Sequence, residues 1–94
     1  MTRVTFHLAA PLRTFAGGRS RIEVDAPAPT LAAALDALWE VCPGARDRVV
    51  TEQGEVRPYV NVFVGPESVR GTGGLAMPVR DGAEISILPA VSGG

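Results

Sequence analysis

The sequence predicts an α+β domain in which a mixed sheet of four to five strands packs on one main helix. Two observations carry this prediction. Apolar residues alternate with polar ones near both ends of the chain, and one stretch between them repeats its apolar residues with the period of a helix. The chain has 94 residues, a length that suits one domain with one core.

The first two strands are predicted from alternation. Val4, Phe6 and Leu8 alternate with polar residues, which predicts a half-buried strand over residues 3–8. The same pattern predicts a second strand over residues 20–25. The loop of roughly ten residues between them is longer than most hairpin loops.

The main helix is predicted over residues 31–42, with Thr30 as its N-cap and Pro43-Gly44 as its end. Its apolar residues fall on one stripe that should face the sheet. The stripe consists of Leu31, Ala34, Leu35, Leu38 and Cys42. Residues 45–50 are expected to add a short helical turn, and residues 51–58 a polar loop.

The second half of the chain contains the strongest strand signal, over residues 59–64, where apolar residues occupy both faces and favour a central strand. Val69-Arg70 is predicted as a brief edge strand, and residues 84–88 as the last strand, after a turn at Asp81-Gly82. If the first and last strands pair in the middle, they run parallel, which is the β-grasp arrangement.

Pro89 lacks an N–H and is expected to turn the chain off the sheet. The sequence therefore divides into a folded domain, residues 1–88, and a flexible tail, residues 89–94. The tail ends in Gly93 and Gly94, which have no side chains and can enter a slot too narrow for other residues. A terminal carboxylate with this reach is a candidate substrate: an ATP-using enzyme can convert it to an acyl-adenylate, and sulfur can then displace AMP to leave a thiocarboxylate.

Composition argues against several other classes of function. The net charge of -1 gives no reason to expect nucleic acid or a membrane surface as a partner, and no apolar run is long enough to span a bilayer. The N-terminus has no signal-peptide core, so we expect a cytoplasmic protein. The sequence shows no nucleophile–base pair and no metal cluster, so we expect no bound cofactor, no metal and no enzymatic activity. Cys42 is expected to be a packed side chain, and His7 to have no ligand role.

Four segments carry a resemblance to a known family: residues 60–64, 69–70, 73–75 and, most specifically, 81–94. They resemble the MoaD/ThiS family of prokaryotic ubiquitin-like sulfur carriers, and the tail looks most like the cysteine-biosynthesis (CysO) type. The resemblance implies a ubiquitin-like β-grasp fold and a carrier in place of an enzyme. It also implies that Gly94 is adenylated and thiocarboxylated. Partner enzymes would recognise the rest of the tail, which comprises Pro89, Ala90, Val91, Ser92 and Gly93.

The resemblance further implies the partners. An adenylating sulfurtransferase of the MoeB, ThiF or MoeZ kind would use ATP, a cysteine synthase dependent on pyridoxal phosphate would accept the sulfur, and a zinc metalloprotease of the JAMM type would release the product. Three alternatives stay open: the small subunit of molybdopterin synthase, a carrier for a thiosugar or another sulfur-containing metabolite, and an interaction module with an inert tail. Ala90 stands where the molybdopterin type usually has a second proline, which weakens the first alternative.

A partner-facing surface is predicted at Phe63, Leu75 and Met77, because exposed apolar residues beside a sheet provide a grip for other proteins. Replacing both Leu75 and Met77 with serine is expected to weaken partner binding and leave thermal stability nearly unchanged. A binding assay and a thermal melt of the double variant test this, and a large loss of stability would instead place the two residues in the core.

Overall fold

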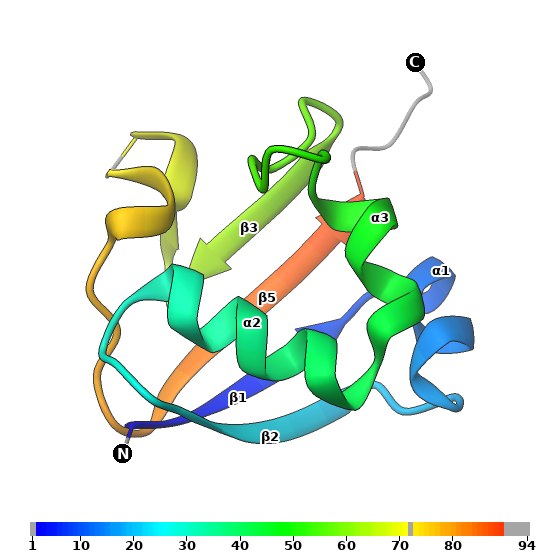
Figure 1. Cartoon of the computed structure of the whole chain (residues 1–94), viewed down its shortest axis with the longest axis horizontal. Helices are drawn as coiled ribbons and strands as arrows, with labels where there is room; N and C mark the ends of the chain where they lie inside the picture. The colour runs from blue at the N-terminus through cyan, green and yellow to red at the C-terminus, as the bar shows by residue number, and fades with distance from the viewer. Residues whose placement is uncertain (1, 72, 90–94) are drawn as a thin grey trace.

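A mixed sheet covered on one face by a long helix forms the body of the protein (Figure 1). The computed structural model describes residues 2–71 and 73–89. The strands are β1 (Thr2–Leu8), β2 (Arg21–Ala26), β3 (Val60–Val64), β4 (Glu67–Ser68) and β5 (Ala83–Pro89). The α-helices are α1 (Ala10–Arg13), α2 (Leu31–Val41) and α3 (Arg46–Val49). The 3₁₀ turns are η1 (Thr14–Ala16), η2 (Pro43–Ala45), η3 (Val69–Gly71) and η4 (Gly74–Ala76).

The sheet has the strand order β2-β1-β5-β3-β4. β1 and β5 pair in parallel at its centre, as predicted, and the other neighbours pair antiparallel. The turn before β5 fixes where the parallel pairing begins. Asp81 Oδ1 accepts the N–H of Arg3 at 2.8 Å, and the N–H of Gly82 donates to the Arg3 carbonyl at 2.7 Å. Gly82 has a φ of 88°, which favours glycine at this turn.

The core lies between α2 and one face of the sheet. All five residues of the predicted helix stripe are buried, as is Trp39. Thr30 caps α2 as predicted, because its Oγ1 accepts the N–H of Ala33 at 3.2 Å. From the sheet, Phe6, Ile85 and Ile87 are fully buried. Each buried side chain of this size contributes about 1.5–3 kcal/mol relative to exposure, so this layer supplies most of the stabilisation.

The connection between β1 and β2 is more ordered than the predicted loop. α1 and η1 lie within it, and they bury Leu12 and Ala16. The burial of these two side chains holds the segment together with two hydrogen bonds, from Arg13 Nε to the Leu8 carbonyl at 3.0 Å and from Arg19 Nε to the Ala16 carbonyl at 2.9 Å.

The predicted edge strand at Val69-Arg70 is wrong. The turn after β3 has only two residues, Gly65 and Pro66, so Glu67 lies directly opposite Val64 and the short β4 begins there. Val69 then leaves the sheet in η3 and buries its side chain, which is 2% exposed. The predicted central position of residues 59–64 also needs correction: β3 is next to the edge, and β4 covers only its last two residues.

Met77 belongs to the core and does not present an exposed side chain. The segment that contains it runs beside the start of α2, where the N–H of Leu31 donates to the Met77 carbonyl at 2.9 Å and the N–H of Val79 donates to the Pro29 carbonyl at 3.0 Å. This pairing turns the Met77 side chain inward, where it is 8% exposed. Leu75 is half-buried and packs against the core. The double serine variant is therefore expected to lose stability through Met77.

Pro89 does not turn the chain off the sheet at once. It is the last residue of β5 and lies opposite Val60. On its other side β1 has already ended, since the last hydrogen bond there runs from the N–H of Ala9 to the Ile87 carbonyl. A residue without an N–H therefore fits at this position. The division into domain and tail stays a prediction, with the strand reaching one residue beyond it.

Arg70 covers the part of the β3 edge that β4 leaves bare. Its Nη2 donates to the carbonyl oxygens of Arg57, at 2.7 Å, and Pro58, at 2.9 Å, and also to that of Val60. The N–H of Gly65 donates to the Glu84 carbonyl in β5. Because the backbone groups of successive residues point alternately to the two neighbouring strands, those of Val60, five positions earlier, point away from β5. One side chain thus satisfies the Val60 carbonyl, which another strand would otherwise satisfy, together with two carbonyls of the preceding loop.

Replacing Arg70 with methionine is expected to lower the free energy of unfolding by about 1–3 kcal/mol, because charged hydrogen bonds to the edge are lost. Urea denaturation of the variant measures this. Arg80→Met is the matched control, since the Arg80 side chain is exposed and has no hydrogen bond or ion pair among the described residues. Equal stabilities of the two variants would show that water satisfies these carbonyl groups as well as Arg70 does.

Candidate functional site: the end of β5 and the open face of the sheet

The candidate site begins where the described part of β5 ends. Five of the predicted site residues, Ala90, Val91, Ser92, Gly93 and Gly94, lie outside the described residues, and their roles stay predictions. The structure describes the base from which they follow. That base is Pro89, the last residue of β5, which lies opposite Val60 of β3. The inward side chains of β5, Ile85 and Ile87, are fully buried. The tail therefore follows directly from a central strand of the core.

The face of the sheet opposite α2 has no helix packed on it in the described part of the chain (Figure 1). Near the end of β5 this open face is apolar. Leu88 is 41% exposed, and it lies opposite Asn61 on β3. Phe63, which is half-buried, is two residues further along β3 on the same face, within reach of Leu88 across the diagonal. Of the three predicted interface residues, only Phe63 lies on this face.

The opposite part of the open face, on β1 and β2, is charged. His7 Nε2 lies 2.6 Å from Glu84 Oε1, across the parallel pair of β1 and β5. Arg3 pairs with Asp25 at 3.1 Å, and this carboxylate raises the pKa of the Arg3 guanidinium. The open face thus carries apolar side chains on β5 and β3, at Leu88 and Phe63, and ion pairs on β1, β2 and the start of β5.

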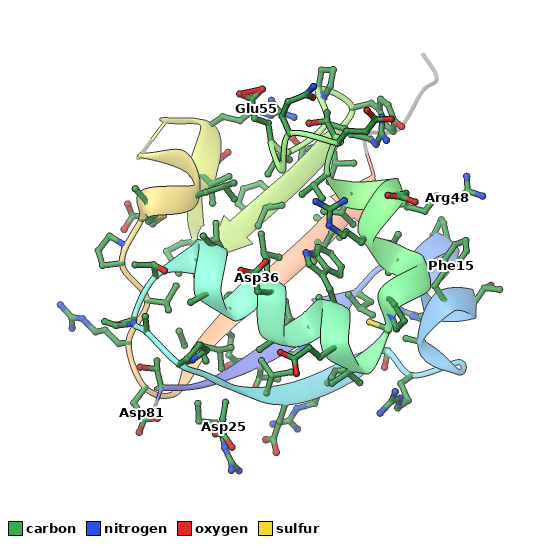
Figure 2. All side chains as sticks on the ribbon, in the orientation of Figure 1. Phe15, Asp25, Asp36, Arg48, Glu55 and Asp81 are labelled. Carbon is green, nitrogen blue, oxygen red and sulfur yellow. The ribbon has the colours of Figure 1, made fainter. Side chains whose placement is uncertain are left out.

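A hollow of about 420 Å³ lies beside the base of the tail. Tyr59, which precedes Val60 and is 53% exposed, forms one wall. Phe15 and Arg48 form another, with the Arg48 guanidinium carbon 5.1 Å from the centre of the Phe15 ring. Figure 2 shows these two side chains on the side of the view toward which β5 runs. The hollow combines aromatic surface with a cation that has no carboxylate partner among the described residues.

Cys42 is buried, as predicted. Its side chain is 2% exposed, and its thiol donates to the Leu38 carbonyl at 3.4 Å. Burial raises the pKa of the thiol, and the charge of Arg19 opposes this only in part. A raised pKa and a closed environment both reduce the amount of reactive thiolate.

Within residues 2–71 and 73–89, no group of three or more histidine, cysteine or acidic side chains is placed to hold a metal ion. None of the helices in this part of the chain has the length and apolar character needed to cross a membrane.

The fold and the placement of this site define the class of protein: a ubiquitin-like β-grasp domain whose last strand lies in the middle of the sheet. The chain belongs to the ThiS family, which matches residues 6–94.

Proteins related over nearly the whole chain agree with this assignment. The sulfur carrier protein CysO of Mycobacterium tuberculosis is 37% identical, across 97% of this chain and 98% of its own. A chain in the crystal structure of the Amycolatopsis orientalis BexX/CysO complex superposes with a TM-score of 0.85, at 36% identity, covering 97% of this chain and 99% of that one. Small archaeal modifier protein 1 of Haloferax volcanii is 36% identical over 93% of this chain and 95% of its own.

Sequence reasoning missed several residues of the site. The sequence does not predict the contact between His7 and Glu84, because 77 positions separate the two residues and only the parallel pairing of β1 and β5 brings them together. Tyr59, Phe15 and Arg48 come from three separate segments, and none carries a motif. The exposure of Leu88 could have been predicted, because it is an apolar residue on the polar side of the alternation in β5.

We predict that Cys42 reacts with a thiol reagent at least about a hundredfold more slowly in the folded protein than in urea, because modification requires local opening of the core. Absorbance of released thionitrobenzoate measures the two rates. Comparable rates would mean that the thiol is accessible and available for sulfur chemistry.

Proposed function

We propose that this chain is a sulfur carrier whose Gly94 carboxylate is converted to a thiocarboxylate that donates sulfur in a biosynthetic reaction, in the manner of the CysO type. The observation that supports this most strongly is the central strand β5, whose sequence continues into the Gly93-Gly94 tail, in a chain of the ThiS family. The protein supplies the reacting carboxyl group and a surface for recognition, and partner enzymes supply the catalysis.

The chemistry has two steps, both carried out by a partner. A carboxylate oxygen of Gly94 attacks the α-phosphorus of ATP, which forms the acyl-adenylate and releases pyrophosphate. A sulfur nucleophile at the oxidation level of sulfide then attacks the acyl carbon, the C–O bond to AMP breaks, and the thiocarboxylate remains. The buried and weakly acidic Cys42 thiol is a poor alternative carrier of the sulfur, because its thiolate is disfavoured.

Recognition by the adenylating partner is assigned to the apolar surface around the end of β5. Leu88, Phe63 and Tyr59 supply exposed or half-buried apolar area there, and Arg48 supplies a cation that has no carboxylate partner within residues 2–71 and 73–89. Aromatic residues and arginine are the residue types that contribute most to protein interfaces. An acidic, apolar surface on the partner fits this pattern and would hold the enzyme next to the tail.

For the sulfur acceptor we propose a cysteine synthase dependent on pyridoxal phosphate, with a zinc metalloprotease that releases the product. The support is the 37% identity to CysO over nearly the whole chain. The related CysO of Amycolatopsis orientalis is seen in a complex with BexX. The alternative acceptor that we propose is an enzyme that makes a thiosugar or another sulfur-containing metabolite.

A second candidate function is attachment of Gly94 to other proteins, favoured by the 36% identity to small archaeal modifier protein 1. It begins with the same adenylation, followed by attack of an amine in place of sulfur. The sequence contains no lysine, so the chain offers no side-chain amine for attachment of further copies to itself.

Intact-mass measurement tests the carrier proposal directly. We expect incubation with an adenylating enzyme of this family, ATP and sulfide to add the mass that corresponds to one oxygen replaced by sulfur, and deletion of Gly94 to abolish the gain. An unchanged mass with an enzyme shown to be active on its own carrier would overturn the proposal.

The Cys42→Ala variant is the matched control. It retains Gly94 and is expected to gain the same mass, whereas loss of the gain in this variant would place the sulfur on the thiol. Addition of a lysine-containing acceptor protein without sulfide separates the second candidate, because a conjugate with the mass of both proteins minus water appears only if an amine attacks the activated Gly94.

A further inference from the structure

The outer edge of β2 is unpaired in the described part of the chain. β2 is the last strand of the sheet on its side and pairs only with β1. Figure 1 shows it along the lower rim of the sheet, with no element drawn beyond it. A strand of six residues with a bare edge is a template for pairing with another strand.

The register identifies which backbone groups are free. The N–H of Leu8 donates to the Ser20 carbonyl at 2.8 Å, in line with the register of β1 and β2. Because hydrogen-bonded pairs alternate along an antiparallel ladder, Ile22 and Val24 point their backbone groups toward β1. The backbone groups of Arg21, Glu23 and Asp25 therefore point outward, and none has a hydrogen-bond partner among the described residues.

The side chains along this edge are charged in an order that complements itself. Arg21 and Glu23 lie on the open face with side chains 64% and 50% exposed, and their charged ends are 3.6 Å apart. If a second copy of β2 lies antiparallel with Ile22 opposite Ile22, then Arg21 of each copy faces Glu23 of the other. Arg19 would face Asp25 in the same register.

The alternative registers place like charges opposite each other, although the one centred on Glu23 also places Arg21 of each copy opposite Asp25 of the other. Centring the pair on Glu23 places two glutamates directly opposite each other, and centring it on Val24 places Glu23 opposite Asp25. Like charges directly opposite on neighbouring strands are destabilising. The register centred on Ile22 also satisfies the backbone, because Arg21 and Glu23 both carry outward groups and can exchange hydrogen bonds.

We propose that two copies of this chain associate edge to edge through β2, about a two-fold axis at Ile22, and extend the sheet across both copies. The contact is isologous, since each copy contributes the same surface. On the helix side, the small Ser20 of one copy lies opposite Val24 of the other. The shallow groove lined there by Pro27, Ala37 and Val41 leaves this side of the edge open.

A contact of one strand pair is small, so the association is weak and transient. It leaves the end of β5 free, because β1 lies between β2 and β5 in the sheet. Dimerisation through this edge therefore does not compete with use of the tail, and it stands or falls independently of the sulfur-carrier proposal.

Sedimentation equilibrium of the full chain from roughly 10 µM to 1 mM at low salt tests the association. We expect a monomer–dimer equilibrium that weakens as salt is added. Arg21→Glu and Glu23→Arg are each expected to weaken it at least about tenfold, because each turns two attractive cross-strand pairs into repulsive ones. Both side chains are exposed, so each variant is expected to fold. Thermal melts of the variants check this.

The double variant Arg21→Glu/Glu23→Arg restores both pairs in the Ile22 register and is expected to dimerise within about threefold of the original chain. An equimolar mixture of the two single variants is expected to form a heterodimer. A monomer at every concentration, a dimer indifferent to the single reversals, or a double variant that stays monomeric would each overturn the proposal. The last of these would indicate the Glu23-centred register instead.

Discussion

The parallel pairing of β1 and β5 is the constraint on which the rest of the structure depends. Two strands from opposite ends of the chain become neighbours, and every other element has to be placed by the connection between them. Asp81 and Gly82 lock the start of this pairing onto Arg3. The buried residues of both strands then form the floor on which α2 packs. The last strand consequently lies in the middle of the sheet, with Ile85 and Ile87 fully buried in the core beneath α2.

In this arrangement one face of the sheet packs in the core and the other face is left for contacts with partners. One face is committed to the core, so the recognition surface has to come from the open face and from the end of the sheet. There the apolar residues gather beside Pro89, while the ion pairs of Arg3 with Asp25 and His7 with Glu84 lie on β1, β2 and the start of β5. Exposed ion pairs contribute little to stability, and their effect here is to keep β1, β2 and the start of β5 polar on this face.

The two edges of the sheet differ in whether a side chain of the protein satisfies their outward backbone groups. At the β3 edge, β4 is only two residues long, and the guanidinium of Arg70 satisfies the carbonyl of Val60 and those of Arg57 and Pro58 just before the strand. At the β2 edge no side chain takes this role within the described residues, so the outward backbone groups of Arg21 and Glu23 face solvent. One edge is therefore covered in part by the chain itself, and the other is open to a second strand.

The sequence by itself determined the elements whose side chains repeat with a clear period. The alternation in β1, β2 and β5 and the stripe and Thr30 cap of α2 were all predictable, because periodic burial leaves a periodic sequence. It also determined the Gly-Gly ending and the family resemblance. Only the tertiary structure decided the placement of Met77, Val69 and Arg70, since their burial depends on what the segment after β3 lies against. The same is true of the His7–Glu84 pair and the hollow at Tyr59. These contacts join residues far apart in the chain, and no local pattern encodes a distance that arises only when β1 and β5 pair.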